Sequence, residues 1–388
     1  MSQINVRNLS NENDDGAPDI VGVSTFSATS YFVPPVGNTA QRPDNPQPGD
    51  LRFNTDTASL EYFKGDTLNW SQIEMTSPDL NGGARGLVMG GYRDSPVSAR
   101  QNIIDYVAIP TLGNAIDFGN LTGNKYLTAA CSSRTRGFAI AGEGPSTIKN
   151  IDTVVFASTG DATDYGDITA NTRTNTGISD ATRGFSICGE VPATKNVIEY
   201  FTMASTGTGV DFGDALSPRT NPQATSSSTR GVIAGGRTPS PASTLYNSME
   251  FITMSSTGNG TDFGDMAIQA MAGGNQGNCS SSVRGLFGGG YNFPSSPYSS
   301  FNVIQFITIA TTGNTQDFGD LINTVSGGSQ FSSPTRGINA GGLAGDQSTN
   351  LATIDTVEIL TTGNAVDFGD LTASRRTIAG CSNAHGGL

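Results

Sequence analysis

An eleven-residue stretch recurs along the chain with small changes, and this repetition constrains the fold more than any other feature. It reads STGNGTDFGDM at 256–266, TTGNTQDFGDL at 311–321 and TTGNAVDFGDL at 361–371. An Asp-Phe/Tyr-Gly-Asp/Asn tetrapeptide, here called the corner, begins at residues 117, 164, 211, 262, 317 and 367. Self-similarity at a fixed period indicates stacked copies of one supersecondary unit, so we expect a repeat array.

Each corner belongs to a longer unit that begins with an Arg-Gly pair. Repeats 1 to 6 are defined by these arginines, which lie 47 to 54 residues apart: Arg85, Arg136, Arg183, Arg230, Arg284 and Arg336. The pair opens one short strand, and an alternating run such as NVIQFITI (302–309) predicts a second strand that is partly covered on both faces. A strand before the Arg-Gly pair and another that starts at the corner give four strands per repeat.

Four strands per repeat and a period near 50 residues are typical of the blades of kelch-type propellers, whereas blades of the Trp-Asp type have about 40–45 residues. The 50 glycines and the charged content of 14% fit an all-β chain with many tight turns. The predicted fold class is therefore all-β, a six-bladed kelch-like β-propeller over residues 77–388.

The two ends of the repeat region predict how the ring closes. Repeat 1 lacks a strand before Arg85, and the chain ends in SRRTIAGCSNAHGGL (374–388), which reads as such a strand with no repeat after it. The C-terminal strand can therefore complete the first blade, built from 85–122 plus 375–384. Closure of this kind removes two exposed sheet edges.

The corner is predicted to be structural. Gly207, Gly258, Gly313 and Gly363 would supply positive φ in the preceding turn, and Phe212, Phe263, Phe318 and Phe368 would wedge between blades. Guanidinium suits a bidentate carboxylate, so each repeat arginine is expected to pair with its own corner. The pairs are Arg136 with Asp164 and Asp167, Arg183 with Asp211 and Asp214, Arg230 with Asp262 and Asp265, Arg284 with Asp317 and Asp320, and Arg336 with Asp367 and Asp370. A ring of Ca²⁺ sites is the alternative, because Asp oxygens suit hard cations.

The connections after the Arg-Gly strands differ from repeat to repeat, as in YRDSPVSARQN (92–102). Variable loops on a constant frame are where recognition usually resides, and aromatic residues are common binding anchors. The candidate binding residues on this variable-loop face are Tyr92, Arg93, Arg237, Tyr246, Tyr291, Phe293 and Tyr298. The alternative is that these loops merely tolerate changes of length.

The sequence argues against an enzyme. Copper radical oxidases of the kelch class need histidines, and this chain has one, His385, at a terminus expected to fray. Zinc-type Cys and His spacing is absent, and Cys131, Cys279 and Cys381 read as small buried hydrophobes. Carboxylate pairs of the glycosidase type stay open, but most of the Asp residues recur between repeats, as scaffold residues do. We expect no catalysis, no cofactor and no resident metal.

Residues 1–30 read as an extended arm and 31–76 as a small β module. Its predicted strands are DLRFNT (50–55) and SLEYFKG (59–65), and Trp70 would cap a tiny core. The stretch 34–73 resembles a small module of tailed-phage virion proteins, and together with the repeats it is similar to structural proteins of phages that infect marine cyanobacteria. The matching residues are Gly37, Gln41, Arg42, Pro43, Pro48, Gly49, Arg52, Phe53, Asn54, Thr55, Leu60, Glu61 and Trp70.

The resemblance implies a virion component, a tail fibre, appendage or capsid decoration, whose residues 1–76 bind other virion proteins while the propeller faces outward. Homo-oligomerisation would follow, and a trimer about a fibre axis is one of the states that it allows. The alternatives are a lectin-like module for host surface glycan and a glycan depolymerase. The net charge of −13 argues against nucleic acid or an anionic membrane as partner, and no apolar run of about 18 residues would insert in one.

Overall fold

The computed structural model describes residues 34–57, 59–65, 69–72, 84–95, 98–238, 244–267, 277–292 and 299–388. In these ranges the chain is all-β, with a single turn of 3-10 helix, which confirms the predicted class. The chain divides into two compact units, residues 1–77 and 78–388. No helix of the described ranges has the length and apolarity needed to cross a membrane. The candidate residues Phe293 and Tyr298, like the arm 1–30, lie outside the described residues.

The smaller unit holds one four-stranded sheet in the order β1-β2-β3-β4. Its elements are β1 (Val36–Gly37), η1 (Thr39–Gln41), β2 (Leu51–Asn54), β3 (Ser59–Phe63) and β4 (Trp70–Gln72). The strand β1 is parallel to β2, and the other pairs are antiparallel. Both strands predicted from the sequence, β2 and β3, are present.

The core of the smaller unit is polar, and it uses several of the residues on which the sequence resemblance rests. The fully buried Glu61 carboxylate accepts hydrogen bonds from Arg42 and from Asn54, and Arg52 lies 3.3 Å away as an ion pair. The hydrogen bond from Arg42 is the main cause that lowers the pKa of Glu61. The Trp70 ring packs 5.5 Å from that of Phe63. A module too small for a large apolar core thus gains order from a buried ion cluster.

The larger unit consists of antiparallel sheets that follow the repeats. Sheet 1 holds β30 (Ala379–Ser382), β5 (Arg85–Met89), β8 (Ile103–Ala108) and β9 (Ile116–Asn120). Sheet 2 holds β10 (Ala129–Ser132), β11 (Arg136–Glu143), β12 (Thr147–Val155) and β13 (Thr163–Asp167). Sheet 3 holds β14 (Thr176–Ser179), β15 (Arg183–Ile187), β16 (Val197–Thr202) and β17 (Val210–Asp214). Sheet 4 holds β18 (Gln223–Ser226), β19 (Arg230–Ala234), β20 (Ser248–Thr253) and β21 (Thr261–Asp265).

Repeats 5 and 6 depart from the prediction of one four-stranded sheet each, because they share an eight-stranded sheet. It holds β22 (Arg284–Gly288), β23 (Tyr291–Asn292), β24 (Ser299–Thr308), β25 (Gln316–Ser326), β26 (Ser329–Ser332), β27 (Arg336–Ala344), β28 (Asn350–Glu358) and β29 (Val366–Asp370). The long strand β25 runs past its corner and pairs with the end of β27, which joins the two repeats. A separate ribbon pairs β6 (Tyr92–Arg93) with β7 (Ala99–Arg100).

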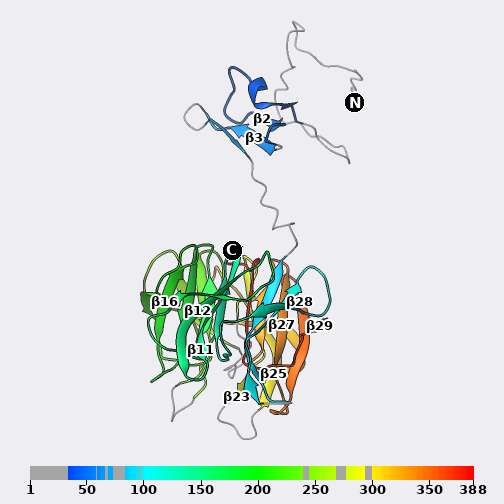
Figure 1. Cartoon of the computed structure of the whole chain (residues 1–388). Helices are drawn as coiled ribbons and strands as arrows, with labels where there is room; N and C mark the ends of the chain where they lie inside the picture. Colours follow the sequence, from blue (N-terminus) through cyan, green and yellow to red (C-terminus); the bar gives the residue numbers. More distant parts are fainter. Residues whose placement is uncertain are drawn as a thin grey trace, which may run out of the picture. The chain divides into compact units, whose positions relative to one another are not determined.

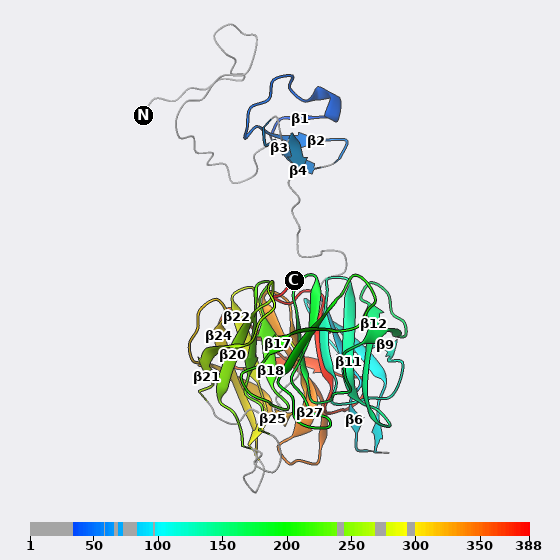
Figure 2. The same ribbon diagram turned by 90° about the vertical axis from the view of Figure 1, so that its left-hand side faces the viewer.

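The last strand of the chain pairs with the first strand of the larger unit, as the sequence predicts. In this antiparallel pair Ala379 lies opposite Met89, and Ser382 lies opposite Gly86. Figure 1 accordingly shows cyan strands from the start of this unit beside the orange strands β27 and β28 from its end. In Figure 2, the consecutive sheets that hold β20 and β24 stand side by side.

Six buried serines are joined to one another by hydrogen bonds, five of them in β10, β14, β18, β26 and β30 and the sixth, Ser280, just before β22. Each hydroxyl donates to the backbone carbonyl of the serine in a neighbouring repeat, at 2.5 to 3.0 Å. The bonds run from Ser382 to Ser332, Ser332 to Ser280, Ser280 to Ser226, Ser226 to Ser179, Ser179 to Ser132, and Ser132 to Ser382. They form a closed cycle, here called the serine ring, and every member has 0% exposure.

The apolar clusters also join neighbouring repeats. Phe212 packs with Ile233 and Met254 of repeat 4, and Phe368 of repeat 6 packs with Val88 and Ile109 of repeat 1. This confirms the predicted wedging of the corner aromatics. The glycine of the Arg-Gly pair serves the same contact: a Cβ on Gly86 would lie closer than 3.0 Å to the Phe331 ring of repeat 6.

Candidate functional site

The corner joins each repeat to the next through its backbone. At the junction of repeats 3 and 4, the Gly258 N–H donates to the Phe212 carbonyl at 2.8 Å, and the Asn259 side chain accepts from the Asp214 N–H at 3.0 Å. The same side-chain bond recurs at Asp265 with Asn314, Asp320 with Asn364, and Asp370 with Asn114. The bond from Asp370 leads from repeat 6 back to repeat 1.

The corner glycine is the position that needs glycine. Gly213 has a φ of +148°, and a Cβ there would lie closer than 3.0 Å to the Gly258 carbonyl oxygen of the next repeat. The prediction for the turn glycines is wrong at Gly207, Gly258 and Gly363, which have no such φ and would meet no atom within 4 Å. The close approach of two backbones, rather than the turn itself, explains the glycine in the tetrapeptide.

The predicted ion pairs between repeat arginines and corner aspartates are wrong. Among the described residues, no repeat arginine forms an ion pair with these aspartates. Most of them donate instead to carbonyls at the end of the alternating strand in a neighbouring repeat: Arg85 to Phe156, Arg230 to Ile309 and Ala310, Arg284 to Ile359, and Arg336 to Ile109 and Pro110. The guanidinium of Arg230 also stacks 4.1 Å from the Phe251 ring.

The corner aspartates themselves lie exposed or half-buried. They are Asp164, Asp167, Asp211, Asp214, Asp262, Asp265, Asp317, Asp320, Asp367 and Asp370. Asp167 pairs with Lys149 of its own repeat at 3.1 Å, across two largely exposed side chains. Solvated carboxylates gain little from an ion pair, whereas a partly buried guanidinium gains more from carbonyls that need donors. In the described residues, no group of three or more His, Cys, Asp or Glu side chains is placed to hold a metal ion.

On the variable-loop side, the structure brings two tyrosines of repeats 1 and 2 together. The Tyr92 and Tyr126 rings lie 5.4 Å apart. Arg376 covers Tyr92 at 5.0 Å and binds Asp94 through two hydrogen bonds, while Arg100 covers Tyr126 at 5.5 Å. All these side chains are half-buried, so their polar edges reach solvent.

An ion-pair chain extends this cluster toward repeat 3. Arg100 lies 3.6 Å from Glu143, which also pairs with Arg173, and Arg173 lies 3.1 Å from Glu190. We call the whole group the Tyr–Arg surface, comprising Tyr92, Asp94, Arg100, Tyr126, Glu143, Arg173, Glu190 and Arg376. Backbone bridges at equivalent positions, Tyr92 with Arg376, Tyr126 with Glu143 and Arg173 with Glu190, place its members.

The other sequence-predicted binding residues do not join this surface. Arg93 is half-buried in β6, and Tyr291 is half-buried in β23. Arg237 donates to the Thr220 hydroxyl at 3.1 Å, and Tyr246 lies beneath Arg219, 4.8 Å from its guanidinium. The sequence reasoning missed Tyr126 and Arg376 because it searched only the loops after the Arg-Gly strand. The equivalent position before β10 and before β30 would have revealed them.

Buried acids on the alternating strands form a second set of contacts that sequence reasoning missed. Asp105 pairs with Arg375 at 2.7 Å, Asp152 with Lys125 at 3.1 Å and Glu250 with Arg219 at 2.8 Å. Each acid also accepts from the backbone N–H that follows a corner, as Glu250 does from Leu216.

The corresponding acids of repeats 3 and 6 form no ion pair within the described part of the chain. Glu199 accepts from the Thr169 N–H, and Asp355 from the Ile322 N–H. Burial raises the pKa of Glu199, and it raises the pKa of Asp355 to about 6. Burial is the largest cause in both groups, as it is for Glu250, whose pKa is also raised although Arg219 pairs with it.

His385 is not frayed, which corrects the sequence prediction. It has 2% exposure, and its Nε2 lies 3.0 Å from the Ser179 hydroxyl of the serine ring. Its Nδ1 faces Asn278 Nδ2 at 2.9 Å and accepts from the Gly387 N–H at 3.0 Å. Burial lowers its pKa to about 4. The tail 384–388 thus fills the interior beside the serine ring.

The contact between Ser179 and His385 does not have the polarity of a nucleophile and its base. The Ser179 hydroxyl already donates to the Ser132 carbonyl, and His385 Nδ1 faces two N–H donors. The imidazole proton therefore resides on Nε2, which donates to Ser179 rather than accepting its proton.

The four cysteines are buried and free, which confirms the prediction for Cys131, Cys279 and Cys381. Burial raises the pKa of Cys188, Cys279 and Cys381 to about 12, so their thiols stay protonated and unreactive. Comparison of the sequence with protein-family models and with curated proteins gives no match.

Proposed function

We propose that residues 84–388 form a closed six-bladed, kelch-like β-propeller. Three kinds of contact support closure between the last and the first repeat. They are the pairing of β30 with β5, the serine ring, and the bond from the Gly113 N–H to the Phe368 carbonyl. The shared sheet of repeats 5 and 6 is then a local extension of one blade toward its neighbour.

We further propose that the protein is a non-enzymatic structural component of a phage virion, anchored through the smaller unit and displaying the propeller. The observation that carries this proposal is the convergence of Arg42, Arg52, Asn54 and Glu61 on one buried cluster beside Trp70. These residues carry the resemblance to phage modules. Since they contact one another in a single cluster, the resemblance rests on a shared structural element rather than on residues that match independently.

Particle incorporation tests this function. The full chain should assemble into particles made without the native copy, whereas a chain that starts at residue 78 should stay in the unassembled fraction. Its melting transition should match that of the larger unit in the full chain. Incorporation of the shortened chain at the normal level would refute anchoring through the smaller unit.

Adhesion to host surface glycan is a second candidate function, and the Tyr–Arg surface favours it. Two neighbouring aromatic rings offer faces for sugar rings, while the flanking guanidinium and carboxylate groups can bind hydroxyls. A glycan array should show binding that Tyr92→Ala and Tyr126→Ala abolish and that Tyr246→Ala leaves intact. Equal binding by all three variants would place recognition elsewhere, and release of reducing ends from bound glycan would favour the depolymerase alternative.

A further inference from the structure

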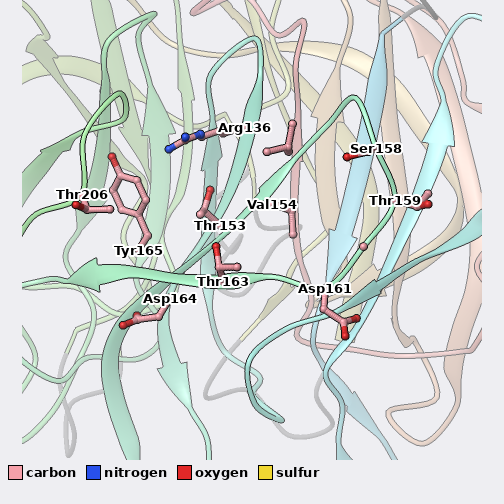
Figure 3. A pocket seen from close by; sticks show the side chains of 12 residues that line it. Arg136, Thr153, Val154, Ser158, Thr159, Asp161, Thr163, Asp164, Tyr165 and Thr206 are labelled. Carbon is pink, nitrogen blue, oxygen red and sulfur yellow. The ribbon is translucent and has the colours of Figure 1, made fainter.

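Repeat 2 contains a cavity on the side of the corners. Its volume is about 310 Å³, and Figure 3 shows the polar side chains around it. Its lining includes Arg136, Thr153, Asp161, Asp164, Tyr165 and Thr206. The last of these belongs to repeat 3, and the others to repeat 2.

The cavity exists because repeat 2 lacks an aromatic side chain that most repeats have. In the pairing of the Arg-Gly strand with the alternating strand, Thr153 lies opposite Phe138. Tyr106, Tyr200, Phe251 and Phe306 occupy the same register position in repeats 1, 3, 4 and 5. In each of those repeats the ring lies under the repeat arginine, at 4.1 to 5.4 Å. None of the described aromatic rings lies beneath Arg136 in this way.

Repeat 2 also places a second hydrogen-bond donor in the turn where its arginine would find acceptors. It alone has tyrosine in the corner, and the Tyr165 hydroxyl lies 2.6 Å from both the Thr202 and the Ser205 carbonyl oxygens. These two carbonyls flank Met203 and Ala204, the positions of repeat 3 that correspond to Ile309 and Ala310, whose carbonyls accept from Arg230. A phenol thus occupies the turn in which the guanidinium of another repeat finds its acceptors.

The two changes together release Arg136. Among the described residues, its guanidinium has no hydrogen-bond acceptor, ion-pair partner or stacked ring, although it lines the cavity. Repeat 6 shows that one change is not enough. It also has threonine, Thr356, at the aromatic position, but its corner keeps Phe368, and Arg336 retains the Ile109 carbonyl.

We propose that this cavity binds a hexuronate residue, a pyranose that carries one carboxylate. The Arg136 guanidinium would bind the carboxylate, and the Asp164 carboxylate with the Thr153 and Thr206 hydroxyls would bind ring hydroxyls. The two aspartates that also line the cavity, Asp161 and Asp164, disfavour a compact dianion such as phosphate, but they suit a ligand rich in hydroxyl donors. The volume is that of a small-ligand pocket. The inference does not depend on the proposed function, because this cavity and the Tyr–Arg surface share no residue.

Titration calorimetry on the full chain tests the site, with glucuronate and galacturonate as ligands and with glucose, galactose and inorganic phosphate as controls. We expect saturable binding of a uronate and at least about tenfold weaker binding of neutral sugars and phosphate. Arg136→Ala should weaken uronate binding about tenfold or more. Arg134→Ala removes an exposed arginine two residues away and should change nothing.

Tyr165→Phe is the sharper variant, because it restores the corner found in the other repeats. Arg136 should then turn to the carbonyls of repeat 3 in a crystal structure, and uronate affinity should fall about tenfold while the melting temperature is retained. No saturable uronate binding by the wild type, equal binding of neutral sugar or phosphate, or undiminished binding by Arg136→Ala or Tyr165→Phe would each overturn the proposal.

Discussion

The corners and the Tyr–Arg surface both occupy equivalent positions of successive repeats, but the corners keep the same contacts in each repeat and the Tyr–Arg surface does not. At the corners, one set of backbone and asparagine contacts recurs from junction to junction, as at Asp214 and Asp370. On the Tyr–Arg surface, equivalent positions hold different chemistry, for example Tyr92 in repeat 1, Glu143 in repeat 2 and Arg237 in repeat 4. The difference teaches that recurrence marks contacts on which the fold depends, whereas variation at equivalent positions marks surface available for recognition.

Removal of residues 377–388 should have the largest effect. It deletes β30, two bonds of the serine ring and the buried His385, and it exposes the edge of β5. We expect loss of more than about 5 kcal/mol, comparable to the whole stability of many domains, seen as the loss of a cooperative melting transition. The double variant Tyr92→Ala/Tyr126→Ala should melt within a few degrees of wild type. Similar melting temperatures for the truncated and full chains would show that the contacts of β30 are no more important for stability than the Tyr–Arg surface.

Substitution of paired glycines at one junction should come second. Gly213→Ala places a Cβ against the Gly258 carbonyl at a φ that disfavours side chains, so we expect a loss of about 2–4 kcal/mol in denaturant unfolding. Gly258→Ala, in the same junction, meets no atom within 4 Å and should cost less than about 1 kcal/mol. Equal costs at the two positions would mean that the close approach is not what fixes the corner.

The buried tail should make the larger unit acid-sensitive. The pKa of His385 is about 4 in the folded state against 6.5 for an exposed histidine, so the unfolded state binds the proton more readily. Its contribution is present in full above pH 6.5 and is lost as the pH falls toward 4, by about 2–3 kcal/mol. Comparison of unfolding free energies from pH 7.5 to 4.5 should show a shallower loss for His385→Gln than for wild type. Parallel curves would indicate that His385 titrates normally in the folded chain.

The smallest effect is expected on the Tyr–Arg surface. Arg173→Ala breaks its ion pairs with Glu143 and Glu190, yet a third of the Arg173 side chain is exposed. Exposed ion pairs contribute little, so the free energy of unfolding should change by less than about 1 kcal/mol. A loss as large as that of Gly213→Ala would show that this surface is structural as well.

The sequence was sufficient to predict features that recur within each repeat, but it was insufficient to predict which residues of neighbouring repeats contact each other. The alternation of apolar and polar residues and the additional strand at 379–382 can be recognised in the sequence. The all-β fold class and the pairing of β30 with β5 could therefore be predicted. The partners of Arg230 could not, because backbone carbonyls from residues 79 and 80 positions away compete with the corner carboxylates and leave no mark in the sequence. His385 was misjudged because a terminal position says nothing about an interior that needs filling.

The released Arg136 illustrates the same limit. Tyr165 is visible as a departure from the corner pattern, but its consequence depends on where its hydroxyl reaches in repeat 3. Thr153 becomes informative only once the strand register places it opposite Phe138. A residue that departs from the repeat pattern can therefore be found in the sequence, but the contacts that it gains or loses can be identified only in the structure.

The central claim is that the C-terminal strand closes the larger unit onto its first strand, and a disulfide tests it most directly. Leu87 lies opposite the native Cys381 in the antiparallel pair, a geometry in which a disulfide can bridge the two positions. Because Cys381 is buried and unreactive in the folded chain, the Leu87→Cys variant is refolded from denaturant under oxidising conditions, which should yield an 87–381 disulfide in peptide mass spectra. Val88→Cys, which lies opposite Gly380, should yield none. A folded Leu87→Cys protein whose two thiols stay free under the same oxidation would contradict closure.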